Sequence, residues 1–368
     1  MIKNINCPYS EFMEKSDKEN IPIRCIFELT FRCNLRCYHC YNNEFESQPL
    51  TTKEIKHILD QLADNGTFFI IFTGGEIFMR EDIFNILEYA NHKKFVMSLF
   101  TNGTLLNEEK AKRLAGYNII SLEVSIYAPY ASLHDKITRT SGSFQKSVNA
   151  IRLLRKQEIR VALKVSLFKD NIKTYAEIKK FADSNGVKCT FSHVISPMRD
   201  GNTKNMNVRI SAKNFSKYLP DIYREALSFF AQDDSIPFED KLELPVCSAA
   251  RNTFAIDPYG ELFPCLLAPE AAGSLCKDSF RDLWRSSNVL RQWRDLRYKD
   301  ISGCNECKFL LKCPICPVDQ LLENGSLGPI KEICDSTYIL YKEAIKHKYY
   351  TRRLKEKTLD NVFKTGGK

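Results

Sequence analysis

The sequence predicts an α/β protein built on a parallel sheet and followed by a smaller cysteine-rich region. Apolar strand-like runs alternate with helical segments about six times before residue 206. From there on, short strand-like pieces and scattered Pro, Gly and Cys replace the alternation, as in domains whose core is metal rather than apolar side chains. Three of the 14 cysteines lie between residues 33 and 40, and seven form a spaced group from Cys247 to Cys334.

The predicted elements alternate along the chain, beginning with a strand. The strands cover residues 26–29, 68–72, 95–100, 119–126, 160–167 and 187–194, and the helices cover 53–64, 82–91, 108–115, 144–157 and 174–185. Thr51 and Thr52 open the first helix, and Gly186 ends the last. Such alternation indicates parallel strands joined by right-handed crossovers. Periodicity alone does not separate a doubly wound sheet from a barrel, in which loops after the strands form the active-site face.

Residues Cys33-Asn-Leu-Arg-Cys37-Tyr-His-Cys40 follow the first predicted strand at a C-x3-C-x2-C spacing. Cysteine is the usual ligand of iron–sulfur clusters, so three thiolates can hold three irons of a four-iron cubane and leave one iron open. Buried structural cysteines, or half of a zinc site, are the alternatives. Zinc sites usually pair two C-x2-C knuckles, and no second knuckle follows within the next 200 residues. The spacing therefore favours the open cluster.

Gly74, Gly75 and Glu76 end the second predicted strand. Glycines let a ligand approach the backbone closely, and a carboxylate placed there can meet an ammonium group. Taken alone, the triplet also fits a tight strand-to-helix turn with a solvated Glu76. In a barrel, this triplet, the cysteine loop and the Thr-Asn-Gly run at residues 101–103 would converge, because each comes just after a strand.

The two motifs together resemble the radical S-adenosylmethionine (SAM) enzymes, and the resemblance covers most of the chain. It extends through Asn102, Ser125, the His134-Asp135 pair with Arg139, and the Gly-Ser-Phe run at residues 142–144. It implies a partial (β/α)6 TIM-like barrel in which Cys33, Cys37 and Cys40 hold a 4Fe–4S cluster. In that family, the open iron binds the amino and carboxylate groups of S-adenosylmethionine.

The same resemblance implies roles for further residues. Gly74, Gly75 and Glu76 would bind the methionine amino group, Ser125 the ribose or carboxylate, and Arg139 the carboxylate, with Asn102 also at the cofactor. His39 stands where the family has an aromatic residue beside the adenine, although ring packing alone also explains a histidine there. The implied reaction is reductive cleavage to a 5′-deoxyadenosyl radical, which abstracts hydrogen from an unactivated C–H bond while the protein supplies orientation and excludes water.

The downstream cysteines resemble the SPASM domain, the auxiliary-cluster domain of many peptide-modifying radical enzymes. The spacing is C-x12-G-x4-C, a gap, C-x2-C-x5-C-x2-C, a second gap and a last cysteine, with x2 where the pattern usually has x3. A zinc ribbon is disfavoured because ribbons separate their knuckles by more than ten residues. The resemblance assigns Cys304, Cys307, Cys313 and Cys334 to one cluster, and Cys247, Cys265 and Cys316 to another. The fourth ligand of the latter stays open between Cys276, a non-cysteine residue, water and substrate, and we favour an open or non-cysteine site.

Length, composition and charge set the remaining limits. The four predicted segments are an N-terminal extension (1–20), the barrel (21–205), a linker with the SPASM domain (206–345) and a basic tail (346–368). The tail carries eight Lys/Arg and two Asp/Glu, so +6 of the net charge of +9 resides there. A solvated basic helix end explains this better than nucleic-acid binding. The sequence shows no secretory signal and no membrane-length apolar run, which predicts a cytoplasmic protein whose cysteines serve metal or catalysis rather than disulfides.

The resulting hypothesis is a radical SAM/SPASM enzyme that modifies a peptide residue by thioether or C–C cross-linking, epimerisation or oxidation. It would use three iron–sulfur clusters, S-adenosylmethionine and an electron donor such as flavodoxin or ferredoxin. The first twenty residues are too short for a peptide-recognition domain, so a separate recognition protein or direct recognition by the barrel is expected. Cys25 or Cys189 would be a hydrogen-atom donor for epimerisation if it pointed into the barrel, although buried packing is the commoner role. The alternatives are oxidation of a small molecule or tetrapyrrole, maturation of a partner enzyme, or a metal-binding regulator.

Overall fold

The computed structural model describes residues 8–42, 49–218, 222 and 236–346. Cys7 and all of the predicted basic tail except Lys346 lie outside these residues. Contacts divide the chain into two compact units, of which one holds residues up to 209, 247–296 and 321–323, and the other holds 210–246, 297–320 and the residues from 324 on. The division at residue 206 between barrel and SPASM segment stays a prediction, because residues 247–296 cluster with the barrel.

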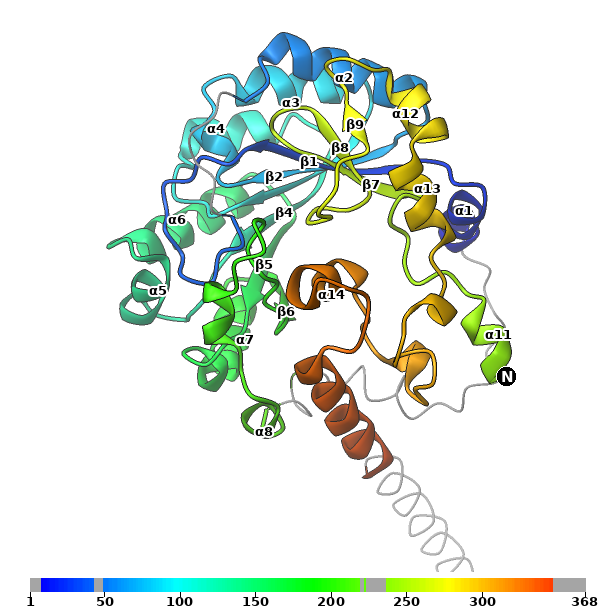
Figure 1. The fold of residues 1–368 in the computed structure, drawn as a ribbon. Coiled ribbons are helices and arrows are strands. Elements are labelled where there is room, and N and C mark those ends of the chain that lie inside the picture. Colours follow the sequence, from blue (N-terminus) through cyan, green and yellow to red (C-terminus); the bar gives the residue numbers. More distant parts are fainter. Residues whose placement is uncertain (1–7, 43–48, 219–221, 223–235, 347–368) are drawn as a thin grey trace, which may run out of the picture. The chain divides into compact units, whose positions relative to one another are not determined.

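The first unit is organised around one nine-stranded sheet, with the strand order β6-β5-β4-β3-β2-β1-β7-β8-β9 (Figure 1). The six barrel strands are β1 (Arg24–Thr30), β2 (Phe69–Gly74), β3 (Val96–Thr101), β4 (Ile119–Ser125), β5 (Val161–Ser166) and β6 (Lys188–Ser192). Each pairs in parallel with its neighbour in sequence. A doubly wound sheet would reverse its order part-way, whereas this order runs in one direction. The predicted partial barrel is therefore confirmed.

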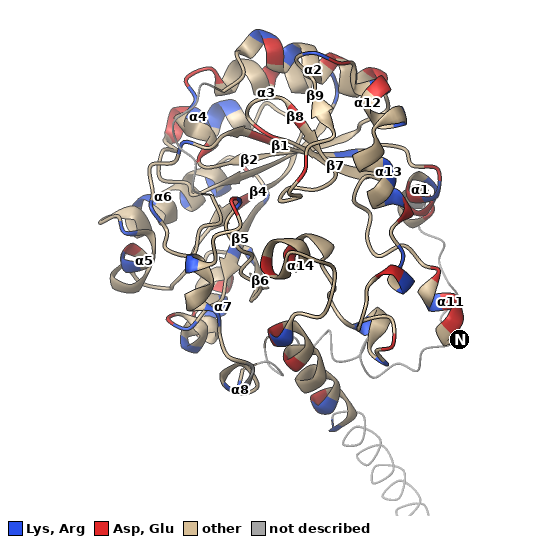
Figure 2. Ribbon diagram, viewed as in Figure 1, with Lys and Arg blue, Asp and Glu red and all other residues tan. Residues whose placement is uncertain are grey.

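Helices cover the outer face of the curved sheet (Figure 1). They are α2 (Thr52–Asp64), α3 (Ile83–His92), α4 (Glu108–Leu114), α5 (Ala131–Thr138), α6 (Ser143–Lys156) and α7 (Tyr175–Ser184). Helix α2 begins in a capping box between Thr51 and Glu54, and its apolar positions Ile55, Ile58 and Leu62 are buried. Lys and Arg alternate with Asp and Glu over α2 and α4, while the strands are mostly uncharged (Figure 2).

Two helices and the pairing of the late strands were not expected from the sequence. Helix α1 (Pro8–Lys18) lies within the predicted N-terminal extension, and its Asp17 pairs with Arg251 at 2.7 Å. Helix α5 has no side-chain cap at its start, so it lacks the usual N-terminal signal. Strands β7 (Thr253–Ile256) and β8 (Glu261–Phe263) coincide with short strand-like pieces expected from the sequence. Their pairing was not expected: β7 pairs in parallel with β1, and β8 and β9 (Gly273–Ser274) continue the sheet. Sequence periodicity cannot predict a pairing between strands about 230 residues apart.

Short elements complete the description. The first unit also contains α12 (Phe280–Ser286), α13 (Asn288–Asp295) and the 3₁₀ turns η1 (Ile77–Met79), η2 (Ile172–Thr174) and η3 (Lys204–Val208). The second unit contains α8 (Ala212–Phe215), α11 (Phe238–Leu242), η4 (Tyr298–Asp300), η5 (Leu310–Lys312), most of α14 (Pro317–Asn324) and a helix over 331–346. Within the described part of the chain, none of the helices has the length and apolarity needed to cross a bilayer.

Candidate active site

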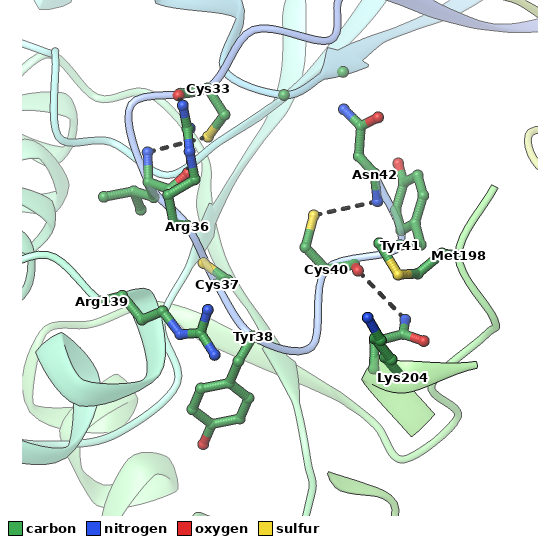
Figure 3. A pocket seen from close by; sticks show the side chains of 14 residues that line it. Cys33, Arg36, Cys37, Tyr38, Cys40, Tyr41, Asn42, Arg139, Met198 and Lys204 are labelled. Atoms are coloured by element: carbon green, nitrogen blue, oxygen red, sulfur yellow. Dashed lines mark hydrogen bonds between the residues drawn. The ribbon is translucent and has the colours of Figure 1, made fainter. Parts of the chain in front are cut away.

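The cysteine loop follows β1 without regular secondary structure and lines a cavity of about 420 Å³ in the first unit. Cys33, Cys37 and Cys40 all face this cavity, as Figure 3 shows. Arg139 and Tyr38 stand on one wall, and Met198 and Lys204 stand on another (Figure 3). Gly74 and Gly75 also line it. The predicted convergence of loops after β1 and β2 is therefore present.

The three cysteines are half-buried, and the loss of hydration at their thiols sets their acidity. It raises the pKa of Cys33 to about 11 and raises the pKa values of Cys37 and Cys40. A buried thiol stays protonated unless a cation stabilises the thiolate, and an iron ion supplies that charge. Among the described residues, no three His, Cys, Asp or Glu side chains converge as they would around a single metal ion. A cluster does not require such convergence, because each cysteine binds a different iron.

Donors from the protein surround the three sulfurs. The backbone N–H groups of Leu35 and Asn42 donate to the Sγ atoms of Cys33 and Cys40, each at 3.4 Å. The side chain of Tyr127 hydrogen-bonds Cys37. Such bonds orient metal ligands and tune cluster potentials. Tyr127 was missed from the sequence because an aromatic residue two positions after a strand carries no motif.

Gly74 and Gly75 are required by the backbone of β1. A Cβ added to Gly75 would lie 2.6 Å from the carbonyl oxygen of Phe31, and it would clash still more closely with that of Arg32. A Cβ on Gly74, where φ is +133°, would overlap the carbonyl oxygen of Thr30. The glycines were expected to admit a ligand. The structure shows a second reason for them. The backbones at the ends of β1 and β2 are in direct contact, and the Gly75 N–H donates to the Thr30 carbonyl oxygen at 2.7 Å.

The carboxylate of Glu76 is completely buried and accepts hydrogen bonds from three groups of the fold. It accepts hydrogen bonds from the Thr101 hydroxyl at 2.7 and 2.9 Å, from the Asn102 N–H at 2.7 Å and from the Phe78 N–H at 3.1 Å. Glu76 thus holds the turn after β3 against the turn after β2. Its predicted contact with a ligand amino group stays a prediction, because three donor hydrogens do not fill the roughly four acceptor positions of a carboxylate.

Asn102 connects the Glu76 turn to the cysteine loop. Its Nδ2 donates to the Asn34 Oδ1 at 2.9 Å and lies 3.8 Å from the Cys33 Sγ. Its Oδ1 accepts from the Thr104 N–H at 2.9 Å and from the Thr104 hydroxyl at 2.6 Å. Asn102 therefore lies next to Cys33 but is not among the residues that line the cavity.

Of the other predicted cofactor residues, one lines the cavity and two do not. Arg139 lines the cavity, and its guanidinium lies 6.0 Å from the Tyr38 ring centroid. Ser125 is not in the lining but hydrogen-bonds Tyr127. His39 also stays out of the lining, because its ring stacks on Phe168 with centroids 4.9 Å apart. Their roles toward a cofactor remain predictions.

His134 and Asp135 stabilise the region around the end of α5, where Arg139 lies, and their hydrogen bonds are structural. Asp135 accepts from the N–H groups of Gly142 and Phe144 at 2.7 and 2.8 Å, so it ties α5 to the start of α6. The Nδ1 of His134 accepts from the Tyr127 N–H at 3.2 Å. An accepting Nδ1 requires a neutral ring, and burial accordingly lowers the pKa of His134 to about 4.

This burial predicts acid sensitivity of the first unit. A histidine whose folded pKa lies below its unfolded value of 6.5 stabilises the fold above pH 6.5, and that contribution is lost as the pH falls through about 4. His134→Gln keeps an acceptor for Tyr127 without titrating. Between pH 7 and pH 4, we expect the unfolding free energy to fall by roughly 3 kcal/mol more in the wild type than in this variant. Denaturant titration followed by tryptophan fluorescence measures this, with the exposed His57→Gln as control. Equal losses in wild type and His134→Gln would contradict it.

The second unit gathers the cysteines assigned to one auxiliary cluster. Cys304, Cys313 and Cys334 line a small cavity, and Cys307 is close enough to raise the pKa values of all three electrostatically, after burial as the main cause. The Thr337 hydroxyl donates to the Cys313 Sγ at 3.3 Å, and the Gln320 Nε2 lies 3.8 Å from the Cys304 Sγ. Neither donor was predicted from the sequence.

The ligand set of the other auxiliary cluster stays a prediction. Cys316 lines the same small cavity as Cys304 and Cys313. Cys247 and Cys265 belong to the first unit, as does Cys276, whose Sγ lies 3.6 Å from the carbonyl oxygen of Tyr259.

The stray cysteines on the barrel strands do not face the cavity. Cys25 is fully buried on the face of β1 that carries Phe27 and Leu29. Cys189 lies near Asp183 and Lys179, on or near α7, and Phe191 on the same face contacts Tyr175 with ring centroids 6.5 Å apart. Strand alternation turns Cys189 toward the helices rather than into the barrel.

Comparison with known proteins agrees with this arrangement. The family model of the radical SAM superfamily matches residues 27–183, and that of the SPASM iron–sulfur cluster-binding domain matches residues 247–308. The chain is 28% identical over 334 residues to the antilisterial bacteriocin subtilosin biosynthesis protein AlbA of Bacillus subtilis, covering 87% of this chain and 72% of that protein. It is 26% identical over 324 residues to the AdoMet-dependent heme synthase of Methanosarcina barkeri, covering 81% of this chain and 91% of that protein.

A solved structure shows the same fold. SuiB of Streptococcus suis, bound to its precursor peptide SuiA, superposes with a TM-score of 0.68 at 19% identity, covering 90% of this chain and 82% of that one. At this identity the likeness concerns the fold alone.

Proposed function

The chain belongs to the radical SAM superfamily and carries a SPASM domain, and from this premise we propose that it is an enzyme modifying a residue within a peptide. The observation that carries the enzyme class is the cavity lined by three half-buried cysteines beside Gly74 and Gly75. Iron–sulfur clusters and S-adenosylmethionine are therefore its cofactors. Three clusters, each with four irons, are the proposed complement.

The residues present fit these cofactors. The three cysteine thiols in the cavity match three irons of an open cubane. The cavity wall also carries two asparagine side-chain oxygens, those of Asn42 and Asn205, that are buried without a hydrogen-bond partner among the described residues. Buried acceptors of this kind call for a donor from a bound molecule. When bound, the cluster and S-adenosylmethionine supply hydrogen-atom abstraction by a 5′-deoxyadenosyl radical.

Within this proposal, the chain's residues have distinct tasks. Cys33, Cys37 and Cys40 hold the cluster, and Arg139 presents a positive charge to the carboxylate of the cofactor. Ser125 positions Tyr127, which in turn orients Cys37. His39, Tyr127 and Phe168 form an aromatic layer that excludes water from one side of the site, with ring centroids 4.5–6.4 Å apart.

A peptide substrate is supported by the relatives whose names concern peptides: a bacteriocin biosynthesis protein and SuiB with its precursor. The sheet face opposite the helices adds support. There, Lys164 lies 3.7 Å from Glu123 and 3.5 Å from the Phe100 ring centroid, and Ser121 hydrogen-bonds Ser98 at 3.0 Å. A peptide offers amide and charged groups to such a polar surface. A separate recognition protein and a flavodoxin or ferredoxin donor complete the proposed system.

Turnover with candidate substrates tests the proposal. The anaerobically reconstituted full chain is supplied with S-adenosylmethionine, a low-potential donor and a short peptide encoded beside its gene. We expect 5′-deoxyadenosine together with a peptide changed in mass by loss of hydrogen, or with one deuterium gained from heavy water if the product is an epimer. Cys25 and Cys189 face away from the cavity, so replacing them by Ala should not prevent epimerisation. Modification of a tetrapyrrole carboxylate instead of any peptide would favour the heme-synthase alternative.

A further inference from the structure

Glu28 is a buried carboxylate that the proposed chemistry does not use. It lies on β1, on the face opposite Cys25 and Phe27, and the residue is 1% exposed. Arg199, which follows β6, forms an ion pair with it, and the Tyr41 hydroxyl donates to its Oε1 at 3.4 Å. Burying two charges costs about as much as their attraction returns, so stability alone does not explain this pair.

Arg199 connects this carboxylate to the cysteine loop. Its backbone N–H donates to the Tyr41 carbonyl oxygen at 2.9 Å, and its guanidinium lies 5.8 Å from the centroid of the Tyr41 ring. Tyr41 directly follows Cys40, and both line the cavity on the same side as Met198 (Figure 3). Both members of the ion pair therefore contact the residue next to a predicted cluster ligand.

The two charges act on the Cys40 sulfur with opposite signs. Burial raises the pKa of the Cys40 thiol, and the charge of Glu28 raises it further, whereas that of Arg199 lowers it. A thiol and an iron–sulfur cluster respond alike to a nearby charge, because deprotonation of one and reduction of the other both add negative charge. A negative charge at this position therefore disfavours reduction of a cluster bound to Cys40, and a positive charge favours it.

We infer that Glu28 lowers the reduction potential of the first cluster, the one held by the cysteine loop, and that Arg199 offsets this effect. This inference rests on the proposed function and adds to it two residues that act on the cluster through their charge. Asp257 is a third charged residue near Glu28. Its Oδ1 accepts the N–H groups of Tyr259 and Glu261 at 2.9 Å each, so it has a structural role of its own.

An auxiliary cluster is the competing target of the pair. The Nη1 of Arg199 also donates to the carbonyl oxygen of Leu266 at 3.2 Å, and Leu266 follows Cys265, a predicted auxiliary ligand. The contacts with Tyr41 involve both Glu28 and Arg199, whereas the bond to Leu266 comes from Arg199. The shared contact favours the first cluster.

Potentiometric titration followed by electron paramagnetic resonance tests the assignment. The reconstituted full chain is reduced stepwise at pH 8.5, and the signal of the first cluster is identified by its loss when all three loop cysteines are replaced by alanine. Burial raises the pKa of Glu28 to about 7, so its carboxylate is ionised at pH 8.5. Glu28→Gln keeps the shape of the side chain and removes its charge. We expect it to raise the ratio of reduced to oxidised first cluster about 10-fold at a fixed potential, or about 59 mV for one electron.

Two further variants separate charge from packing. Glu28→Gln combined with Arg199→Gln removes both charges, so its potential should return towards the wild-type value. Glu88→Gln removes an exposed charge on α3, which solvent screens, and should leave the potential unchanged. An unchanged or more negative potential in Glu28→Gln would overturn the assignment. A double variant as easily reduced as Glu28→Gln, or a shift confined to the signals that remain without the loop cysteines, would also overturn it.

The wild type itself provides the test if Glu28→Gln retains no cluster. Lowering the pH from 8.5 to 6 neutralises Glu28, while Arg199 stays charged and burial holds the pKa of Tyr41 above its usual range. The potential of the first cluster should then become less negative, and Asp257, whose pKa is also raised by burial, acts in the same direction. A potential that stays constant over this range would overturn the assignment. Absence of the first-cluster signal from the wild type would instead overturn the proposed function, and the inference with it.

Discussion

Replacing any one of Cys33, Cys37 and Cys40 by alanine is expected to abolish release of 5′-deoxyadenosine. In the proposed site each thiolate would hold a different iron, so the loss of one would leave two irons without a protein ligand. Chromatographic assay of 5′-deoxyadenosine under reduction, with and without peptide, measures the effect.

Iron content and a matched cysteine variant make this result specific. The wild type should hold about twelve irons, and a variant with alanine at all three loop cysteines about eight, at four irons per cluster. Cys189→Ala removes a thiol that faces α7, so it should keep both the iron content and the turnover of the wild type. Retained turnover in any of the three loop variants would refute the central assignment. A wild-type content near four irons would refute the auxiliary clusters alone.

Gly75→Ala should lower both the unfolding free energy and the iron content of the protein, although it adds only one methyl group. The new Cβ would meet the carbonyl oxygens of Phe31 and Arg32, which are backbone atoms with little freedom to move. The Gly75 and Glu76 N–H groups donate to Thr30 and Arg32, so relieving the clash would break the contact that positions the cysteine loop. We expect a loss of about 3 kcal/mol or more of unfolding free energy and poor retention of the first cluster.

Gly116→Ala is the control for this substitution. A Cβ there would make an ordinary contact of 3.5 Å with the Arg113 carbonyl oxygen. Thermal unfolding and iron analysis of both variants should show wild-type behaviour for Gly116→Ala and losses for Gly75→Ala. If Gly75→Ala keeps wild-type stability and iron content, the backbone contact does not control the site.

The assignment of Glu76 shows where motif reasoning reaches its limit. The Gly-Gly-Glu motif placed a carboxylate correctly at the end of β2, and the sequence leaves open whether that carboxylate faces a ligand or the fold. Thr101 and Asn102 approach from the end of the next strand and donate to both oxygens, so the fold uses this carboxylate, and its contact with a ligand stays a prediction. Which donors meet a carboxylate is a property of its neighbours in space, so no local pattern reports it.

The sequence by itself determined the alternation of strands and helices, the cysteine loop after the first strand, and the two groups of cysteines. These are local properties, because side-chain periodicity and ligand spacing are written in short stretches of chain. Only the tertiary structure decided that β7 joins the sheet beside β1, that Cys189 faces α7, and that Asn42 and Tyr127 adjoin the site. Each of these depends on contacts between segments distant in sequence, or on which side of a strand a residue faces once the sheet is assembled.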